Sequence, residues 1–592
     1  MSQTDLSSVC RVSSVSQDLI QIEVMDAAEF KNQTERRLTI GSHLHISDDD
    51  GHSVIAIVQA YRIKDPLSSV PQAPNYDPSF ILDAQPVGFV TPEGEFRRGG
   101  QQIAIPPTKV SVAGPEVLRA IYVTKGQSHL TIGKLAQDES IEVPIDGDRF
   151  FGKHIAVVGS TGSGKSCSVA RILQEGIRPS DKQKKGALNN SHIVVFDLHG
   201  EYAAAFPKAN VLTVNNLRLP YWLMNSEELE EMFIMSNEQN SHNQVSQFRH
   251  AVVENKRRHD PLMKKVSYDS PVYFSLEEVF RYICNMNSEV VGKKAGEGMP
   301  VLSSGRTQIV KREDRYFDED LTFCEPSTSK EEKASKGPFN GEFDRFCLRL
   351  RTVIDDERLS FLLRPRSARD LEFKTEDLEE IIADIIGYGK NQATNITIVD
   401  LSRIPFEVTS LVVSLMSRII FDVGFYLKRT QAAQAKDTAV PILAVYEEAH
   451  IYAPNSELAR FRSVTRSIER IAKEGRKYGI CLMIVSQRPS EIAETIFSQC
   501  NSFVVMRLTN PADQNYVKRL LPDSVAGLTN SLPTLEQREA LILGDSIAVP
   551  TIVRINDIEH KPNSHDIPVL TEWRDNWRTL PFATVLDGMK RR

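Results

Sequence analysis

The pattern of hydrophobic and polar positions changes twice along the 592-residue chain. Up to about residue 145, short β-prone runs such as LIQIEV (19–24) and ILDAQPVGFV (81–90) are separated by Gly, Pro and Asp residues. The run HISDDDGHSVIAIV predicts a hairpin that turns at Asp50 and Gly51. Several short strands at this spacing predict a small N-terminal β-barrel.

From Phe150 onward, short continuous apolar runs alternate with segments of helical periodicity. Such runs are typical of strands buried on both faces. Their alternation with helices predicts an α/β core, with a mostly parallel sheet and helices on both of its faces. The predicted strands lie in HIAVVG, HIVVFDLHGEY, ITIVDLS, PILAVYEEAH and ICLMIVSQRP.

Between Asn215 and about Gly389 this alternation is interrupted by helical runs such as SEELEEMFIM and FSLEEVFRYI. A polar stretch at about 285–340 predicts a mobile loop within this insertion. The expected domains are therefore an N-terminal barrel (1–145), a first part of the α/β core (146–214), a helical insertion (215–389), a second part of the core (390–560) and a C-terminal tail or brace (561–592).

Composition narrows the classes of function. The chain is 41% hydrophobic and 25% charged, no run reaches the 18–20 continuous apolar residues of a membrane span, and the polar start MSQTDLSSV is not a signal peptide, so we expect no membrane contact. Seven scattered cysteines without a C-x-x-C pair favour the reducing cytoplasm over a disulfide framework or a structural zinc site. Because the net charge is −7, any contacts with nucleic acid require locally concentrated basic residues.

A complete phosphate-binding motif, GSTGSGKS, stands between a predicted strand and a predicted helix. Its glycines let the backbone turn its N–H groups toward phosphate oxygens, and the helix N-terminus adds positive potential. Lys165 is expected to reach the β- and γ-phosphates and the Ser166 hydroxyl to ligate Mg²⁺, which makes ATP and Mg²⁺ the expected ligands. The expected nucleotide-binding residues are Gly159, Ser160, Thr161, Gly162, Ser163, Gly164, Lys165, Ser166 and Cys167.

Two adjacent carboxylates end the predicted strand in AVYEEAH. We expect Glu447 to hold Mg²⁺ through water and Glu448 to orient and polarise the attacking water. Neighbouring side chains of a strand point to opposite faces, so both can approach the phosphate only where the strand frays. The alternative is an acidic pair at a helix N-terminus, stabilised by the helix dipole.

Two further strand ends carry polar residues. Gln487 in MIVSQRPSEI follows a neighbouring strand and is expected to sense the γ-phosphate. Asp197 in FDLHGEY is expected near the nucleotide crevice at the carboxyl end of its strand, with the capping of a turn as its alternative role.

A helix predicted over 456–478 carries a basic stripe opposite its apolar face. The stripe consists of Arg462, Arg466, Arg470, Lys473 and Lys477. A solvated surface is one interpretation. The other is that a cation from this region reaches the γ-phosphate of a neighbouring subunit, with Arg476 as the first candidate for such an arginine finger and Arg470 as the second.

In this order, the motifs HIAVVGSTGSGKS, FDLHGEY, VYEEAH and KEGRKYGICLMIVSQRPSEI resemble the HerA family of DNA translocases, relatives of FtsK-type DNA pumps. The resemblance implies a RecA-like ATPase core behind a HAS-barrel-like domain, a homohexameric ring that threads double-stranded DNA, and a separate effector protein. That effector is a NurA-like or other nuclease, or a sirtuin-type NAD hydrolase in phage-defence pairs.

Residue by residue, Lys165, Ser166, Glu448 and Gln487 match the family's phosphate loop, catalytic glutamate and sensor, and Arg476 matches an arginine proposed to act in trans. Lys153 stands where the family often has a basic residue near the nucleotide. Glu447 departs from the Asp of many relatives, and a water-mediated Mg²⁺ contact can absorb its extra methylene.

Other functions remain compatible with these motifs. The ring could be an ATP-regulated scaffold that assembles and activates its effector, with translocation secondary. A secretion or conjugation ATPase is disfavoured by the lack of a membrane anchor, and a simple P-loop kinase by the size of the chain. DNA contacts are not localised by the sequence; the basic segments DKQKK (181–185), NKRR (255–258), RPRSAR (364–369) and VKRLL (517–521) are the candidates.

Overall fold

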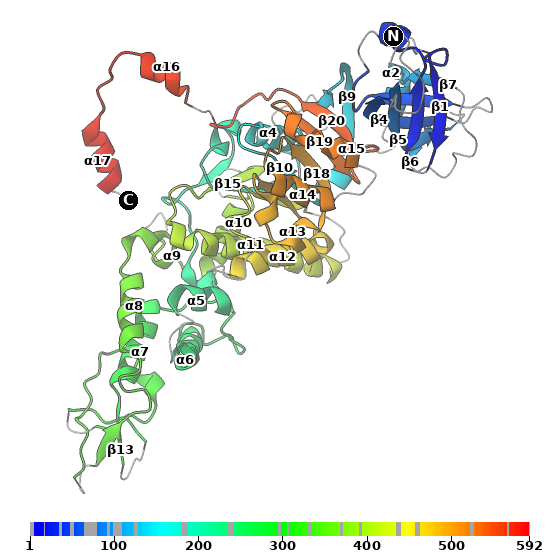
Figure 1. Ribbon diagram of the computed structural model, residues 1–592. Helices are drawn as coiled ribbons and strands as arrows, with labels where there is room; N and C mark the ends of the chain where they lie inside the picture. The colour runs from blue at the N-terminus through cyan, green and yellow to red at the C-terminus, as the bar shows by residue number, and fades with distance from the viewer. Residues whose placement is uncertain are drawn as a thin grey trace.

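The computed structural model describes residues 5–590. Within that span it leaves out 17, 35–37, 48–52, 64–79, 92–94, 99–108, 123–127, 180–187, 235–240, 294–297, 305–306, 330–332, 367–370, 390–392, 434–439, 456–461, 521–525 and 565–566. The molecule is elongated. A curled N-terminal sheet lies at one end of an α/β core, and a helical arm projects from the core in the opposite direction (Figure 1).

The N-terminal sheet is antiparallel and, among the described residues, contains seven strands in the order β1-β2-β5-β4-β3-β7 with β6 on β5. Alternate residues of β2, Ile20, Ile22 and Val24, are buried in its core. The predicted hairpin is confirmed by the pairing of β3 with β4, and its turn at Asp50 and Gly51 lies outside the described residues. The elements are β1 (Cys10–Val15), β2 (Ile20–Val24), α1 (Ala27–Gln33), β3 (His43–Ser47), β4 (Ser53–Ile63), β5 (Phe80–Val90), β6 (Phe96–Arg98), β7 (Lys109–Val112) and α2 (Pro115–Tyr122).

The core sheet has eleven strands among the described residues, in the order β12-β15-β11-β16-β17-β10-β18-β19-β20-β8-β9. The strands from β12 to β18 are parallel, and those from β19 to β9 are antiparallel. All five predicted core strands are present and fall in the parallel part. The strands are β8 (His129–Leu135), β9 (Asp138–Asp146), β10 (His154–Val158), β11 (His192–Asp197), β12 (Asn210–Leu212), β15 (Ile396–Asp400), β16 (Ile442–Tyr446), β17 (Ile480–Ser486), β18 (Cys500–Met506), β19 (Glu539–Gly544) and β20 (Thr551–Ile555).

The antiparallel part extends the core beyond its expected limits. β8 and β9 pair with each other, and β8 pairs with β20. β8 lies within the range 1–145 expected for the barrel, and β9 ends one residue beyond it. The hydrophobic pattern does not reveal this, because an antiparallel strand of a barrel and one of an extended sheet alternate in the same way.

The helices of the core are α3 (Gly147–Phe151), α4 (Lys165–Gly176), α11 (Phe406–Ala433), α12 (Ser463–Glu474), α13 (Glu494–Phe497), α14 (Pro511–Leu520) and α15 (Ala526–Thr529). By length and composition α11 could cross a membrane, which the sequence analysis did not anticipate. The apolar window of α11 is 72% buried inside the fold, which is the environment of a core helix. On α12, Val464, Ile468 and Ile471 are buried, as its predicted apolar face requires.

The insertion contains α5 (Ser226–Phe233), α6 (Ser241–His259), α7 (Leu276–Ser288), α8 (Asp344–Ile354), α9 (Ser360–Leu363) and α10 (Leu378–Ile385), with β13 (Val290–Gly292) paired to β14 (Ala334–Lys336) at its tip. The prediction of a mobile loop at 285–340 is wrong for much of this segment. Tyr316 and Phe317 are buried and pack against the ring of Tyr282 on α7, so this polar stretch is anchored by its few aromatic residues.

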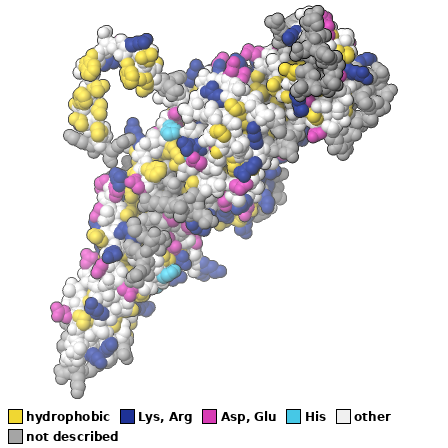
Figure 2. Space-filling model, viewed as in Figure 1, with side chains coloured by type: hydrophobic (Ala, Val, Ile, Leu, Met, Phe, Trp, Pro, Cys, Tyr) yellow, Lys and Arg dark blue, Asp and Glu magenta, His cyan; other side chains and the backbone are white. Residues whose placement is uncertain are grey.

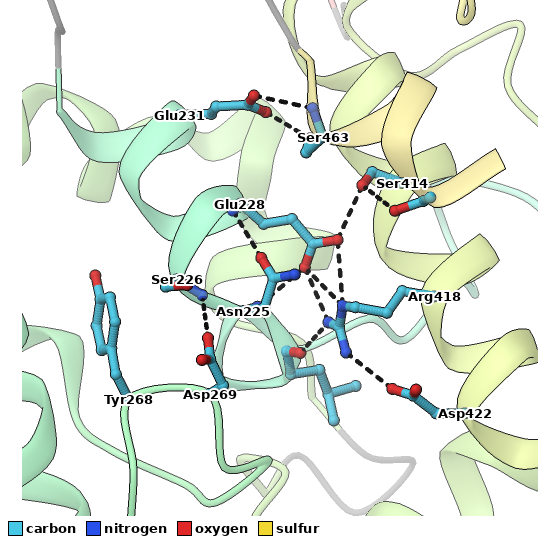
Figure 3. A network of polar contacts seen from close by, with 12 residues as sticks. Asn225, Ser226, Glu228, Glu231, Tyr268, Asp269, Ser414, Arg418, Asp422 and Ser463 are labelled. Carbon is cyan, nitrogen blue, oxygen red and sulfur yellow. Dashed lines mark hydrogen bonds and ion pairs between the residues drawn. The ribbon is translucent and has the colours of Figure 1, made fainter. Parts of the chain in front are cut away.

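A polar network joins the insertion to the core (Figure 3). Glu228 on α5 is fully buried and accepts hydrogen bonds from the backbone of Asn225 (3.0 Å), from Ser414 Oγ (2.9 Å) and from Arg418 Nη2 (2.9 Å) on α11. Glu231 on the same helix accepts the backbone N–H of Ser463 (3.0 Å) and so caps α12. Carboxylates of one short helix therefore hold the core helices α11 and α12.

The C-terminal helices α16 (Val569–Arg574) and α17 (Phe582–Lys590) lie apart from the body of the molecule (Figure 1). Apolar side chains line this segment (Figure 2). Trp573 is 80% and Trp577 is 99% exposed, so neither indole ring is buried against the described residues.

Candidate nucleotide site

The phosphate-binding loop connects β10 to α4 with its glycines at constrained positions. Gly164 caps α4 with a φ of +91°, a left-handed conformation that favours glycine. A Cβ atom at Gly159 would lie 2.7 Å from Ser163 Oγ and 2.8 Å from Met506 Cβ, so the close packing of the loop against β18 also requires glycine. This geometry turns the N-terminus of α4 toward a cavity.

That cavity has a volume of about 550 Å³ and brings together residues from the expected loop, the expected carboxylates and the expected sensor. The C-terminal end of the core forms its other wall. Its lining includes Ser160, Thr161, Gly162, Gly164, Lys165, Ser166, Cys167, His199, Glu201, Glu447, Glu448, Gln487, Gln537, Arg538, Asn556, Asp557, Lys561 and Ser564. Of the expected loop residues, Gly159 and Ser163 do not line it, and Ser163 is buried behind it.

Glu447 and Glu448 follow the last residue of β16, Tyr446, and both face the cavity. Glu448 has a φ of +48°, and this departure from strand geometry lets two adjacent side chains share one side. Lys165 Nζ donates to Glu448 Oε1 at 2.9 Å in a buried ion pair. The alternative of an acidic pair at a helix N-terminus does not fit, because these residues form a turn and the next described helix begins at Ser463.

Glu447 is 1% exposed and carries an uncompensated negative charge when ionised. Burial, followed by the nearby carboxylates of Asp197, Glu201 and Glu448, raises the pKa of Glu447 well above its usual value. Its Oε2 atom has no hydrogen-bond partner among the described residues. A buried carboxylate oxygen of this kind, in a cavity that the Ser166 hydroxyl also lines, fits the oxygen ligands of a divalent cation such as Mg²⁺.

The two polar residues at neighbouring strand ends occupy different places. Gln487 lines the cavity and accepts a hydrogen bond from Thr161 Oγ1 (2.6 Å) through its Oε1, which connects it to the phosphate loop. Asp197 is fully buried and accepts the backbone N–H groups of Gly200 (2.9 Å) and Tyr202 (2.9 Å). Asp197 thus caps a turn, as its alternative role predicts, while its charge acts on Glu447.

His450 is a site residue that the sequence analysis did not single out. Its Nδ1 atom lies 3.4 Å from Glu448 Oε2 and 3.1 Å from Ser486 Oγ, and its burial lowers the pKa of the imidazole. Ser486 Oγ in turn accepts the backbone N–H of Arg488 at 2.9 Å. His450 therefore connects the expected catalytic glutamate with the end of β17, the strand that precedes Gln487. The signal was its place in AVYEEAH, two residues after Glu448.

The wall formed by 537–564 was also missed. Arg538 has a φ of +67°, and its backbone N–H donates to Ser163 O of the phosphate loop at 2.9 Å. Its guanidinium forms an ion pair with Asp557 beside Lys561 and Ser564. No motif marks these residues, because they reach the site only through the folding of β19 and β20 onto the sheet.

Three expected cations lie outside the cavity of the single chain. Lys153 Nζ pairs with Asp545 Oδ2 at 2.5 Å. The guanidinium of Arg470 lies 4.1 Å from the centre of the Phe421 ring, and Arg470 Nη1 is 3.9 Å from Asp422. Arg476, in the turn after α12, is exposed and makes no ion pair with any residue that the structure describes.

Comparison with known proteins gives a consistent family. Residues 130–420 match the family described as "Helicase HerA, central domain". The chain is 25% identical over 530 residues to the "DNA double-strand break repair helicase HerA" of Saccharolobus solfataricus, covering 89% of this chain and 85% of that protein. It is 25% identical over 503 residues to the protein of the same name from Pyrococcus furiosus, covering 80% and 79%. Among solved structures, VirB4 of Thermoanaerobacter pseudethanolicus aligns with a TM-score of 0.43 and 11% identity over 74% of this chain and 98% of that chain.

Proposed function

Because this chain belongs to the HerA helicase family and is an ATPase, we propose that it is a double-stranded DNA translocase that works as a homohexameric ring with a separate effector enzyme. The observation that carries the proposal is the cavity in which the phosphate loop, Glu448 and Gln487 meet. The names of the curated relatives, which are DNA repair helicases, support DNA as the substrate.

We assign the chemistry to the residues that line the cavity. Lys165 and the loop backbone bind the phosphates, Glu448 orients and polarises the attacking water, and Gln487 senses the γ-phosphate. Ser166 and Glu447 would hold Mg²⁺, whose charge neutralises the phosphate oxygens when it is bound. The partnerless oxygen of Glu447 supports this assignment.

The ion pair of Lys165 with Glu448 implies that ATP binds before Glu448 can act on water. Lys165 cannot serve Glu448 and the β- and γ-phosphates with the same geometry, so arrival of ATP draws the ammonium group away from the carboxylate. Glu448 Oε1 then becomes available to accept a hydrogen bond from water, while His450 continues to contact Oε2. In this scheme the site gains its base only when its substrate is present.

A ring would bring an arginine of a neighbouring subunit to the cavity, in addition to Lys165, Arg538 and Lys561, which line it in the single chain. Arg476 is the preferred trans-acting arginine, since it is exposed and unpaired among the described residues, whereas Arg470 is occupied by Phe421 and Asp422. Alanine at Arg476 should lower kcat of the assembled protein about a hundredfold or more. Alanine at Arg470 should leave kcat within a few-fold of wild type, and the reverse result would exchange the two assignments.

The domain division remains part of the proposal. We propose that the curled N-terminal sheet is a closed barrel, supported by the bridge between Asp5 and Ser111 and by the hydrogen bond from Leu6 N–H to Val110 O (2.8 Å), which join the chain before β1 to β7. We place the start of the core at β8, the insertion at 215–389 and the tail from residue 561 onward. We also propose a cytoplasmic location.

The effector is proposed to be a nuclease or an NAD hydrolase, in DNA-end processing or phage defence. The alternative function is a scaffold that assembles and activates this effector, with translocation secondary. The exposed apolar C-terminal segment favours some form of assembly but does not distinguish the two functions.

The deciding experiment measures ATP hydrolysis with and without linear duplex DNA at low salt, in wild type and in Glu448→Gln. Wild type should hydrolyse ATP faster with DNA, and the variant should bind ATP without turnover. A wild-type rate of ATP hydrolysis that does not change when DNA is added would contradict the proposed translocase activity. Activation of the co-purified effector by Glu448→Gln at the wild-type level would establish the scaffold instead.

A further inference from the structure

A second cavity lies at the same carboxyl edge of the parallel sheet, where the edge strand β12 ends. Its volume is about 560 Å³, and it is formed by 214–218, which follow β12, and by residues of 357–366, which include α9. α9 lies between the core and the arm made by α7 and α8 (Figure 1). The cavity therefore opens on the same edge of the sheet as the nucleotide site, beside the edge strand.

The lining of this cavity is basic. Arg218, Arg364 and Arg366 line it, and the one carboxylate in the lining is Glu357. Arg364 Nη2 lies 3.0 Å from Glu357 Oε1, but the side chain of Glu357 is 81% exposed, and Arg218 Nη1 is 3.6 Å from Glu380 Oε1. Ion pairs as exposed as the first contribute little, and an anion of higher charge density can replace them.

The backbone that carries these arginines is anchored by buried residues. Phe361 and Pro365 are buried beneath the cavity, and the guanidinium of Arg218 lies 5.5 Å from the centre of the Phe373 ring. The backbone N–H of Arg364 donates to Ser360 O at 2.9 Å where α9 ends. Because the backbone is anchored in this way, only the arginine side chains need to become ordered when a ligand binds.

We infer that this cavity binds the backbone phosphates of duplex DNA. Guanidinium groups match the oxygens of a phosphodiester in fork geometry, and Ser360 and Asn215 add neutral polar groups to the lining. The only aromatic residue of the lining, Phe361, is 6% exposed, so no ring of the lining is available to stack on an unpaired base. The inference rests on the proposed function, because it assigns part of the DNA contact that the function requires.

The described cations of the other basic segments line neither of the two cavities. Within NKRR, Lys256 is buried, and Arg257 and Arg258 form ion pairs with Glu254 and Asp318. Within VKRLL, Lys518 Nζ donates to Asn530 Oδ1 at 3.0 Å. DKQKK (181–185) lies outside the described residues. RPRSAR differs from these segments because its described arginines, Arg364 and Arg366, line a cavity together with Arg218.

The test compares the full-length double variant R364A/R366A with the matched control R257A/R258A, using a fluorescent blunt duplex at several salt concentrations. The double variant should bind the duplex at least tenfold more weakly. The slope of log affinity against log salt should fall by about 0.9 for each phosphate that the variant no longer neutralises. The affinity of R364K/R366K for the duplex should lie between those of R364A/R366A and the wild type, because lysine keeps the charge but lacks the forked geometry of the guanidinium group. ATP hydrolysis without DNA should match wild type in all of them, which excludes misfolding.

The inference would be overturned if R364A/R366A bound the duplex with wild-type affinity and salt slope. It would also be overturned if the variant kept DNA binding but lost the co-purifying effector. The cavity would then be a site for an acidic protein. A wild-type protein that binds no duplex at low salt would give a different pattern. It would overturn the proposed function, and the inference with it, before any variant is compared.

Discussion

Glu228 at the joint of the insertion and Glu447 in the nucleotide cavity are both almost completely hidden from solvent, at 0% and 1% exposure, yet their surroundings differ. Glu228 receives hydrogen bonds from a backbone N–H, a serine hydroxyl and the guanidinium of Arg418 (Figure 3). Glu447 lies among other carboxylates and has an oxygen without a partner among the described residues. The protein supplies the countercharge in the first region, and the proposed Mg²⁺ would supply it in the second.

This difference in hydrogen-bond partners distinguishes a buried carboxylate with a structural role from one with a chemical role. A buried carboxylate with all its partners holds elements together, and removing it harms the fold. A buried carboxylate that lacks partners lowers stability by its presence, and it is retained because it binds a cation or a water. Substitutions in the two regions should therefore change stability and activity in opposite ways.

The largest effect is expected for Glu448→Gln. Loss of the carboxylate should lower kcat about a thousandfold, because the amide cannot take part in proton transfer from water. The melting temperature of the nucleotide-free protein should fall, because the amide leaves Lys165 buried without its carboxylate partner. Hydrolysis within tenfold of wild type would show that another group activates the water.

Glu228→Ala should lower the free energy of unfolding by about 3–5 kcal/mol, because it leaves Arg418 buried with one carboxylate partner fewer. The change can be measured as a fall in melting temperature. Glu227→Ala is the matched control on the same helix: its ion pair with the exposed Arg466 should contribute less than about 1 kcal/mol. Equal effects of the two variants would contradict the structural role of the joint.

Glu447→Gln should raise the melting temperature of the metal-free protein, because the amide carries no charge to be buried among carboxylates. The same variant should need about tenfold more Mg²⁺ for half-maximal hydrolysis. An unchanged Mg²⁺ requirement would remove Glu447 from the metal site.

His450→Ala should lower kcat about tenfold and leave KM for ATP within about twofold, since it loosens Glu448 without touching the phosphate loop. Partial recovery is expected with His450→Asn, whose amide keeps a polar group beside the carboxylate. A fall in melting temperature without the change in kcat would assign His450 to packing alone.

A pH dependence is expected in the insertion, at Lys256 on α6. Lys256 is buried and donates to the carbonyls of Tyr268 (2.6 Å) and Ser270 (2.7 Å), and burial lowers the pKa of its ammonium group to about 7. In the unfolded chain this lysine titrates at about 10.4. Between these values the unfolded state binds more protons, so its contribution stabilises the fold as pH rises from about 7 and stays unfavourable below that pH.

The measurement compares the melting temperature of wild type with that of Lys256→Met between pH 6 and pH 9. The wild type should gain relative to the variant as pH increases. Parallel curves would show that the ammonium group stays charged in the fold, held by the two carbonyl oxygens and by Asp269.

The parallel half of the core and the phosphate loop could be predicted because their signals are local. Strands such as β10 and β16 are apolar runs, and GSTGSGKS stands between a strand and a helix. The antiparallel extension by β19, β20, β8 and β9 depends on pairing between segments about 400 residues apart in sequence, which no local pattern records. For the same reason Arg538 and Lys561, which enter the site with that extension, were missed.

The ordered structure of the insertion could not be predicted from the local sequence pattern either. The stretch around Tyr316 is polar in composition, and its two aromatic residues anchor it only because α7 offers Tyr282. His450 was visible in sequence but had no assigned role, because its distances to Glu448 and Ser486 depend on how β16 and β17 end side by side.

The left-handed backbone of Glu448, with its φ of +48°, has a consequence for genetics. Asparagine and glycine adopt this conformation more readily than glutamate does, so a mutation to either should relax the chain as it removes the base. Such alleles would produce abundant, soluble and inactive subunits. In the proposed ring these subunits would assemble with normal ones, so Glu448→Asn or Glu448→Gly expressed beside the normal gene should behave as a dominant allele.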